Sequence, residues 1–187
     1  MGLSIQEYIT DYVGNIDRTA FVHPKAHVTD SIIGPRTKVW QFSSVIRGTR
    51  LGKDCVVASN VTLDGPWFGD RCIVSPGVDI GPGFLIGDDV FIGPNVVLCN
   101  DRWPSSSKEG FDVELLRADF VTVHVKSGAA IGANAVVLPG VTVGSNAMIA
   151  AGAVATRSVP DNHLLGRDGQ MAWIRPEWRA RRMRQAA

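Results

Sequence analysis

An apolar residue recurs at every sixth position along most of this chain, and the residue after it is often glycine. The spacing slips once by one residue and is interrupted once by a longer segment. The recurring positions are Ile33, Val39, Val45, Leu51, Val57, Leu63, Phe68, Val74, Ile80, Ile86, Ile92, Leu98, Val125, Ile131, Val137, Val143, Ile149 and Ala155. A second position, four residues after each, is often small, as at Thr37, Ser43, Cys55, Cys72, Ala129, Ala135, Ala147 and Ala153.

A period of six fits neither an α-helix, which needs apolar spacings of three and four, nor a strand that alternates indefinitely. It does fit a very short strand that ends in a tight corner, with three such sides closing a triangular coil. Both recurring positions then point inward, and each coil lies about 4.8 Å above the last. Cys55 and Cys72 fall one coil apart on the same side, so we expect them to stack in the core as reduced thiols.

The interruption begins after Leu98, where Asn100, Asp101, Arg102 and Trp103 arrive together. The repeat resumes near Val123, so the insertion covers residues from about 101 to 122. Long insertions in compact domains are usually functional or disordered. Because Asn100 and Asp101 leave directly from a coil, rigid backbone would anchor them, while Arg102 and Trp103 could reach outward.

This pattern resembles the hexapeptide-repeat family, whose fold is a left-handed parallel β-helix. The resemblance implies an all-β fold of class left-handed parallel β-helix, to which the residues of this chain add one long loop insertion and a C-terminal helix. We expect an N-terminal cap over residues 1–20, in which "LSIQEYITDYV" could form a helix, and the β-helix over residues 21–160. Residues 161–187 are expected to form an extension that is mostly helical, since "RPEWRARRMRQAA" reads as a basic helix.

Bulk properties narrow the range of functions. At 187 residues and 20.1 kDa the chain suits one domain, and its net charge of +1 gives no reason to expect nucleic acid binding. No apolar run approaches the roughly 20 residues of a membrane span. The start lacks the pattern of a secretory signal, and the three cysteines show no metal-ligand spacing, so we expect a cytoplasmic protein.

Three uses of such a prism compete: an acyltransferase that holds coenzyme A, a metal-dependent hydratase of the γ-carbonic anhydrase kind, and a scaffold without chemistry. "KVWQFSSVIRG" at Lys38–Gly48 looks somewhat like the hydratase family. Catalytic zinc, however, needs three converging protein ligands and an open position. The histidines are His23, His27, His124 and His163, with none between Thr49 and Val123, so we expect no metal.

"VWQFSSVIRGTRLGKDCVV", "GDRCIV" and "VFIGPNVVLCNDRWP" look like nucleotide-sugar N-acetyltransferases of bacterial surface-polysaccharide pathways. That family moves acetyl from acetyl-CoA to a 3-amino sugar on UDP or dTDP. By the resemblance, Asn100 positions the amine, which attacks the thioester directly and needs no histidine base. Asn100 could instead be a turn residue that opens the loop, and Asp101 could bind the amine or cap the turn. His124 is the rival catalyst, as a general base, or a surface or sugar-contacting residue.

The resemblance also implies a coenzyme A groove along the later coils. In it the backbone of Ala133 and Ala151 would bind the pantetheine arm, and Arg157 would approach the phosphates. Arg167 would replace an arginine that relatives carry in "GVPAR", where this chain has "LLGRDGQMAW". Arg102 and Trp103 would contact the sugar substrate, and the family assembles as homotrimers with the site between subunits.

One further departure from the family lies in "DGPWFGD", where Trp67 fills a position usually given to a small residue. We expect Trp67 to plug the core at the point where the repeat slips.

Overall fold

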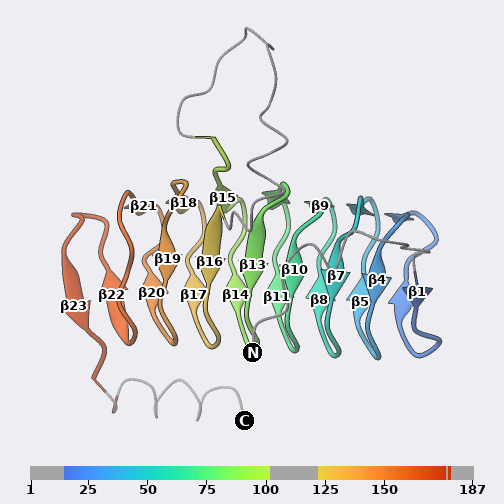
Figure 1. Cartoon of the computed structure of the whole chain (residues 1–187), viewed down its shortest axis with the longest axis horizontal. Helices are drawn as coiled ribbons and strands as arrows, with labels where there is room; N and C mark the ends of the chain where they lie inside the picture. The colour runs from blue at the N-terminus through green and yellow to red at the C-terminus, as the bar shows by residue number, and fades with distance from the viewer. Residues whose placement is uncertain (1–14, 102–121, 176, 178–187) are drawn as a thin grey trace, which may run out of the picture.

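The structure, a computed structural model, describes residues 15–101, 122–175 and 177, and it is a stack of three-sided coils (Figure 1). Each coil contributes one short strand to each of three sheets, which we name A, B and C in the order in which the chain visits them. Neighbouring strands in every sheet pair in parallel, apart from the last pair of sheet B. The parallel β-helix and the all-β class predicted from the period are therefore confirmed.

The strands lie in the following order within their sheets. Sheet A contains β1 (Asn15–Ile16), β4 (Ile32–Ile33), β7 (Arg50–Leu51), β10 (Trp67–Phe68), β13 (Phe84–Ile86), β16 (Val123–Val125) and β19 (Thr142–Val143). Sheet B contains β2 (Phe21–Val22), β5 (Lys38–Val39), β8 (Val56–Val57), β11 (Ile73–Val74), β14 (Phe91–Ile92), β17 (Ala130–Ile131), β20 (Met148–Ile149), β22 (His163–Leu165) and β23 (Met171–Trp173). Sheet C contains β3 (His27–Val28), β6 (Ser44–Ile46), β9 (Thr62–Asp64), β12 (Asp79–Ile80), β15 (Val97–Leu98), β18 (Val136–Val137) and β21 (Val154–Ala155).

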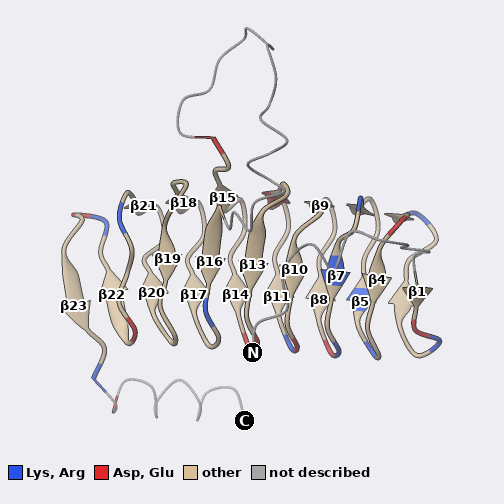
Figure 2. Ribbon diagram, in the orientation of Figure 1, with Lys and Arg blue, Asp and Glu red and all other residues tan. Residues whose placement is uncertain are grey.

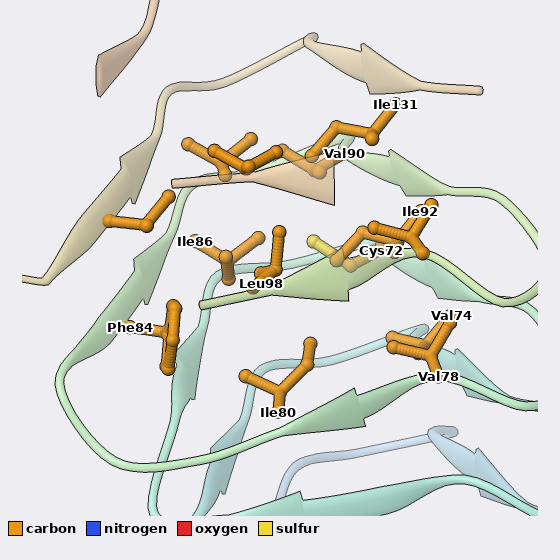
Figure 3. Close-up of a cluster of buried hydrophobic side chains, with 14 of the residues drawn as sticks. Cys72, Val74, Val78, Ile80, Phe84, Ile86, Val90, Ile92, Leu98 and Ile131 are labelled. Atoms are coloured by element: carbon orange, nitrogen blue, oxygen red, sulfur yellow. The ribbon is translucent and has the colours of Figure 1, made fainter. Parts of the chain in front are cut away.

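The core fills the inside of the prism, and every position of the six-residue repeat lies in it. The recurring apolar side chains are at most 6% exposed, and all the small residues predicted to point inward are buried as well. Figure 3 shows part of this column, with Ile80, Ile86 and Ile92 directed into the interior. Like residues stack on like along the axis, which is the arrangement that the period predicted.

The two inner cysteines stack as expected. The Cys72 amide donates to Cys55 Sγ at 3.4 Å, and both are buried free thiols. Trp67, in contrast, does not plug the core. Phe68 takes the inward position, and Trp67 points outward in register with Arg50 and Leu85. The expectation for Trp67 is wrong because, at the five-residue step, the next residue, Phe68, is the one that points inward.

Close stacking of the coils explains the glycine that follows so many inward residues. A methyl group added at Gly52 would lie 2.5 Å from the carbonyl oxygen of Gly69 in the next coil. A methyl group added at Gly132 would lie 2.4 Å from the backbone nitrogen of Ala151. At these corners the backbones approach too closely for any side chain, so glycine is required by contact rather than by an unusual φ.

The ends of the coil differ in part from the expected division. β1 already pairs in parallel with β4, so regular coil structure begins at Asn15, and the rest of the expected cap, residues 1–14, lies outside the described residues. In the C-terminal extension β22 adds to β20, and β23 folds back on β22, so residues 163–173 are β-structure rather than helix. Most of the expected basic helix, residues 176 and 178–187, and residues 102–121 of the insertion also lie outside the described part.

No helix in the described part of the chain is long and apolar enough to cross a membrane.

Candidate functional site

The insertion leaves and rejoins the prism at one corner, which joins sheet C to sheet A and which we call the C–A corner. Asn100 and Asp101 follow β15 at this corner, and both are exposed. On return, the Thr122 amide donates to the Gly83 carbonyl at 2.7 Å, and the Thr122 carbonyl accepts from the Gly140 amide at 2.7 Å. The returning end of the insertion is therefore fixed to the backbone of this corner.

Asn100 lies over a glycine that sequence reasoning did not single out. A methyl group added at Gly81 would lie 3.2 Å from Asn100 Nδ2 and 3.9 Å from the ring of Phe84. The amide thus rests against the bare backbone of the coil below it. The signal in the sequence was only that glycine follows Ile80, as it follows several other inward residues of the repeat, and this does not indicate which side chain lies against it.

His124 points outward from β16, the sixth of the seven strands of sheet A. Its neighbours in register are Leu85 on β13 and Thr142 on β19, and it is half-buried. Burial, and secondarily the charge of Lys126, lowers the pKa of His124 below its ordinary value of 6.5. The imidazole is therefore neutral at pH 7, which is the form that can accept a proton.

Three of the residues expected to hold coenzyme A form one column at a second corner, which joins sheet B to sheet C and which we call the B–C corner. The registers of β17 with β20 and of β20 with β22 place Ala133, Ala151 and Arg167 at the same position of successive coils. Pro94 occupies that position one coil earlier. Among the described residues, the amides of Ala133 and Ala151 donate to no backbone carbonyl. Two N–H groups that donate to no described backbone carbonyl, in one column with a basic residue, suit the amides and phosphates of coenzyme A.

Arg157 lies at the C–A corner, after β21, at the C-terminal end of the coil. Its Nη2 donates to the Gly169 carbonyl at 3.3 Å, which ties it to the same connection that carries Arg167. Arg157 and Arg167 therefore lie near the last coil at opposite edges of sheet C, the first at the C–A corner and the second at the B–C corner. Both side chains are exposed.

Within one chain Asn100 and Asp101 lie at the C–A corner and His124 lies on β16, the strand that follows this corner, whereas Ala133 and Ala151 lie at the other edge of sheet C. One side of the prism is six residues long, and six extended residues span at most about 20 Å. Arg102 and Trp103 lie outside the described residues.

In the described part of the chain, no group of three or more His, Cys, Asp or Glu side chains lies close enough together to hold a metal ion. His124 lies between leucine and threonine in register, whereas His23, His27 and His163 belong to coils near the two ends.

Comparison with known proteins agrees with this architecture. Residues 65–100 and 122–157 match the family described as bacterial transferase hexapeptide (six repeats), and residues 43–65 match the hexapeptide repeat of succinyl-transferase. A dTDP-3-amino-3,6-dideoxy-α-D-galactopyranose 3-N-acetyltransferase of Aneurinibacillus thermoaerophilus is 38% identical over 143 residues, which cover 76% of this chain and 71% of that protein. The chain belongs to the hexapeptide acyltransferase family.

Other relatives of this family share shorter parts or the fold alone. A galactoside O-acetyltransferase of Lactococcus lactis is 35% identical over 79 residues, which cover 42% of this chain and 36% of that protein. The UDP-N-acetylglucosamine acyltransferase of Francisella novicida has the same fold, with a TM-score of 0.57 at 16% identity over 90% of this chain and 73% of its own. The chain spans 30–40% of the length of the first four curated relatives that it matches.

Proposed function

We propose that this protein transfers an acetyl group from acetyl-CoA to the amino group, at C3, of a UDP- or dTDP-linked amino sugar. The single observation that carries the proposal is the Asn100 amide, held against Gly81 at the corner where the insertion leaves the coil. Similarity to an acetyltransferase of a dTDP-linked 3-amino sugar, over most of both chains, supports the substrate class.

The reaction depends mainly on how the amine is positioned beside the thioester. The lone pair of the neutral amine attacks the thioester carbonyl carbon, a C–N bond forms, the C–S bond breaks, and the amine proton ends on the CoA sulfur or on a base. A neutral amine is already a good nucleophile, so holding it beside the thioester supplies much of the rate acceleration. Asn100 would orient the amine through its side-chain oxygen, and Asp101 would accept a second hydrogen bond from it.

His124 offers a second path for the proton. Because its pKa is lowered, the neutral ring is ready to accept the amine proton at pH 7. Direct transfer of the amine proton to the CoA sulfur and its transfer through His124 give the same product. The two paths differ in the rate of a His124→Ala variant, which falls only if His124 accepts the proton.

The coenzyme would lie along the column of Ala133, Ala151 and Arg167, with Arg157 near its phosphates. Since this column and Asn100 occupy opposite edges of sheet C, a site shared between neighbouring protomers brings them together more directly than one protomer does. A homotrimer with three such shared sites is the assembly that we propose, and light scattering after size exclusion tests it.

The test of the function uses acetyl-CoA with a panel of UDP- and dTDP-linked 3-amino sugars, and follows both free thiol and the product mass. Transfer to at least one sugar, lost in Asn100→Ala at an unchanged melting temperature, is expected. If no sugar in the panel accepts acetyl, the function is wrong. If Asn100→Ala keeps the full rate, Asn100 is not in the site.

A further inference from the structure

Trp67, the residue that sequence analysis misplaced in the core, belongs to a column of outward side chains on sheet A. Register pairs Arg50 on β7 with Trp67 on β10, Trp67 with Leu85 on β13, and Leu85 with His124 on β16. We call these four residues the sheet A column. It runs from His124 toward the N-terminal end of the prism, and all four residues are half-buried.

Arg50 and Trp67 are in direct contact. The guanidinium carbon of Arg50 lies 4.6 Å from the centroid of the Trp67 ring, which is a cation–π distance. Arg50 is also the only Lys, Arg, Asp or Glu within the strands of sheet A in the described part of the chain. Figure 2 shows β7 as the blue strand of this sheet, and the blue β5 beside it belongs to sheet B. Arg50 and Trp67 thus place one basic and one aromatic side chain together on the outer face of sheet A.

The direction of the two substrates along the prism follows from the site. Every residue that would hold coenzyme A lies on the C-terminal side of His124, so an acceptor whose amine meets the thioester extends toward the N-terminal coils. One coil rises about 4.8 Å, which puts Trp67 about 10 Å and the base of Arg50 about 14 Å from His124 along the axis. The nucleotide end of a nucleotide-linked sugar lies at this range from its amine.

We propose that Arg50 and Trp67 bind the nucleotide portion of the acceptor, with the guanidinium donating to the diphosphate and the indole contacting the nucleoside. The proposal rests on the proposed function for the direction of the acceptor, but it concerns binding and not transfer. Arginine is suited to oxyanions because its N–H groups form paired, charge-assisted hydrogen bonds. An indole offers a flat apolar face to any base, so this pair would select for a nucleotide more than for one base.

The experiment measures equilibrium binding of thymidine, uridine, dTDP and UDP by calorimetry, without acetyl-CoA. Trp67→Leu keeps an apolar side chain like that of Leu85, and Arg50→Lys keeps the charge but loses the planar fork. Trp40→Leu is the matched control, because Trp40 is also a surface tryptophan but packs against Phe21, at a ring distance of 5.4 Å, beside sheet B.

Trp67→Leu is expected to weaken binding of both the nucleosides and the diphosphates, by roughly 5- to 150-fold. Arg50→Ala is expected to weaken only the diphosphates, by about tenfold or more, with partial recovery in Arg50→Lys. Trp40→Leu should match the wild type. Equal melting temperatures of the variants show that the prism is intact, and if one variant fails to fold, the other still tests the pair.

Two results would overturn the inference. One is a wild type that binds neither diphosphate, and the other is wild-type affinity in both Trp67→Leu and Arg50→Ala. Either result leaves the proposed function standing if acetyl still moves to an amino sugar. Conversely, diphosphate binding that depends on Arg50 and Trp67 stands even if no sugar in the panel accepts acetyl.

Discussion

Two glycines of the coil offer a matched pair of substitutions to alanine. At Gly52 the new methyl group would lie 2.5 Å from the backbone oxygen of Gly69, so the two coils must separate by about 1 Å to reach ordinary contact. At Gly81 the described residues that the new methyl group would meet are the Asn100 amide, at 3.2 Å, and the Phe84 ring, at 3.9 Å. Neither glycine has a positive φ, so the backbone conformation suits alanine at both positions.

The two variants should therefore separate stability from activity. Overpacking against backbone typically costs 1–3 kcal/mol, so Gly52→Ala should lower the free energy of unfolding by about 3 kcal/mol. For a chain of this length that corresponds to a fall in melting temperature of roughly 6–12 °C. Gly81→Ala should change the free energy of unfolding by less than about 1 kcal/mol, yet it should move Asn100 by a few tenths of an ångström and cut kcat about tenfold.

Differential scanning calorimetry and the acetyl-transfer assay measure both quantities on the same preparations. Gly52 lies far from the insertion, so Gly52→Ala should keep the wild-type kcat at a temperature where it is folded. If Gly81→Ala transferred acetyl at the wild-type rate, Asn100 would not depend on its support. If Gly52→Ala melted like the wild type, the close contact between coils would be wrong.

Three further predictions follow from the same geometry. Ala133→Pro removes one backbone N–H at a corner position where the preceding coil already has proline. The variant should keep the melting temperature and raise the KM for acetyl-CoA about 3- to 10-fold. An unchanged KM would show that this N–H does not bind the coenzyme. If His124 is the base, the fall of kcat/KM at acidic pH should lie below pH 6.5, because burial lowers the pKa of His124. This fall should vanish in His124→Ala. If the pH profile is unchanged in that variant, the proton passes directly to the sulfur. A thiol reagent should label Cys99, which is partly exposed, in the native protein, and should label Cys55 and Cys72 only after unfolding; rapid labelling of all three contradicts the stacked core.

The sequence predicted the core well because one geometric rule governs it. A period of six with three sides leaves little freedom, so Val39, Ile92 and Ile131 are buried as expected. The same rule stacked Cys55 on Cys72. It also placed Phe68 in the core correctly. The expectation that Trp67 plugs the core came from the comparison with the family, and it is wrong because Phe68, the next residue, takes the inward position.

The site was predicted less completely, because its geometry depends on stacking between coils rather than on spacing along the chain. Residues of "LLGRDGQMAW" were expected beyond the regular coil, and only the pairing of β22 with β20 places Arg167 in the column of Ala151. Support of Asn100 by Gly81, and of Arg157 by the Gly169 carbonyl, likewise joins residues from different coils. Contacts of this kind leave no pattern in one sequence.

The central claim is that acetyl transfer occurs where the Asn100 corner of one protomer faces the Ala133 and Ala151 column of its neighbour. Its most direct measurement is the activity of mixed assemblies, made by co-expressing Asn100→Ala with the double variant Ala133→Pro and Ala151→Pro under two different tags. Each parent should be nearly inactive at low acetyl-CoA. If sites are shared, random mixing restores about a quarter of them, and the mixed assemblies should recover about that fraction of the wild-type rate. A mixture no more active than its parents would contradict a shared site.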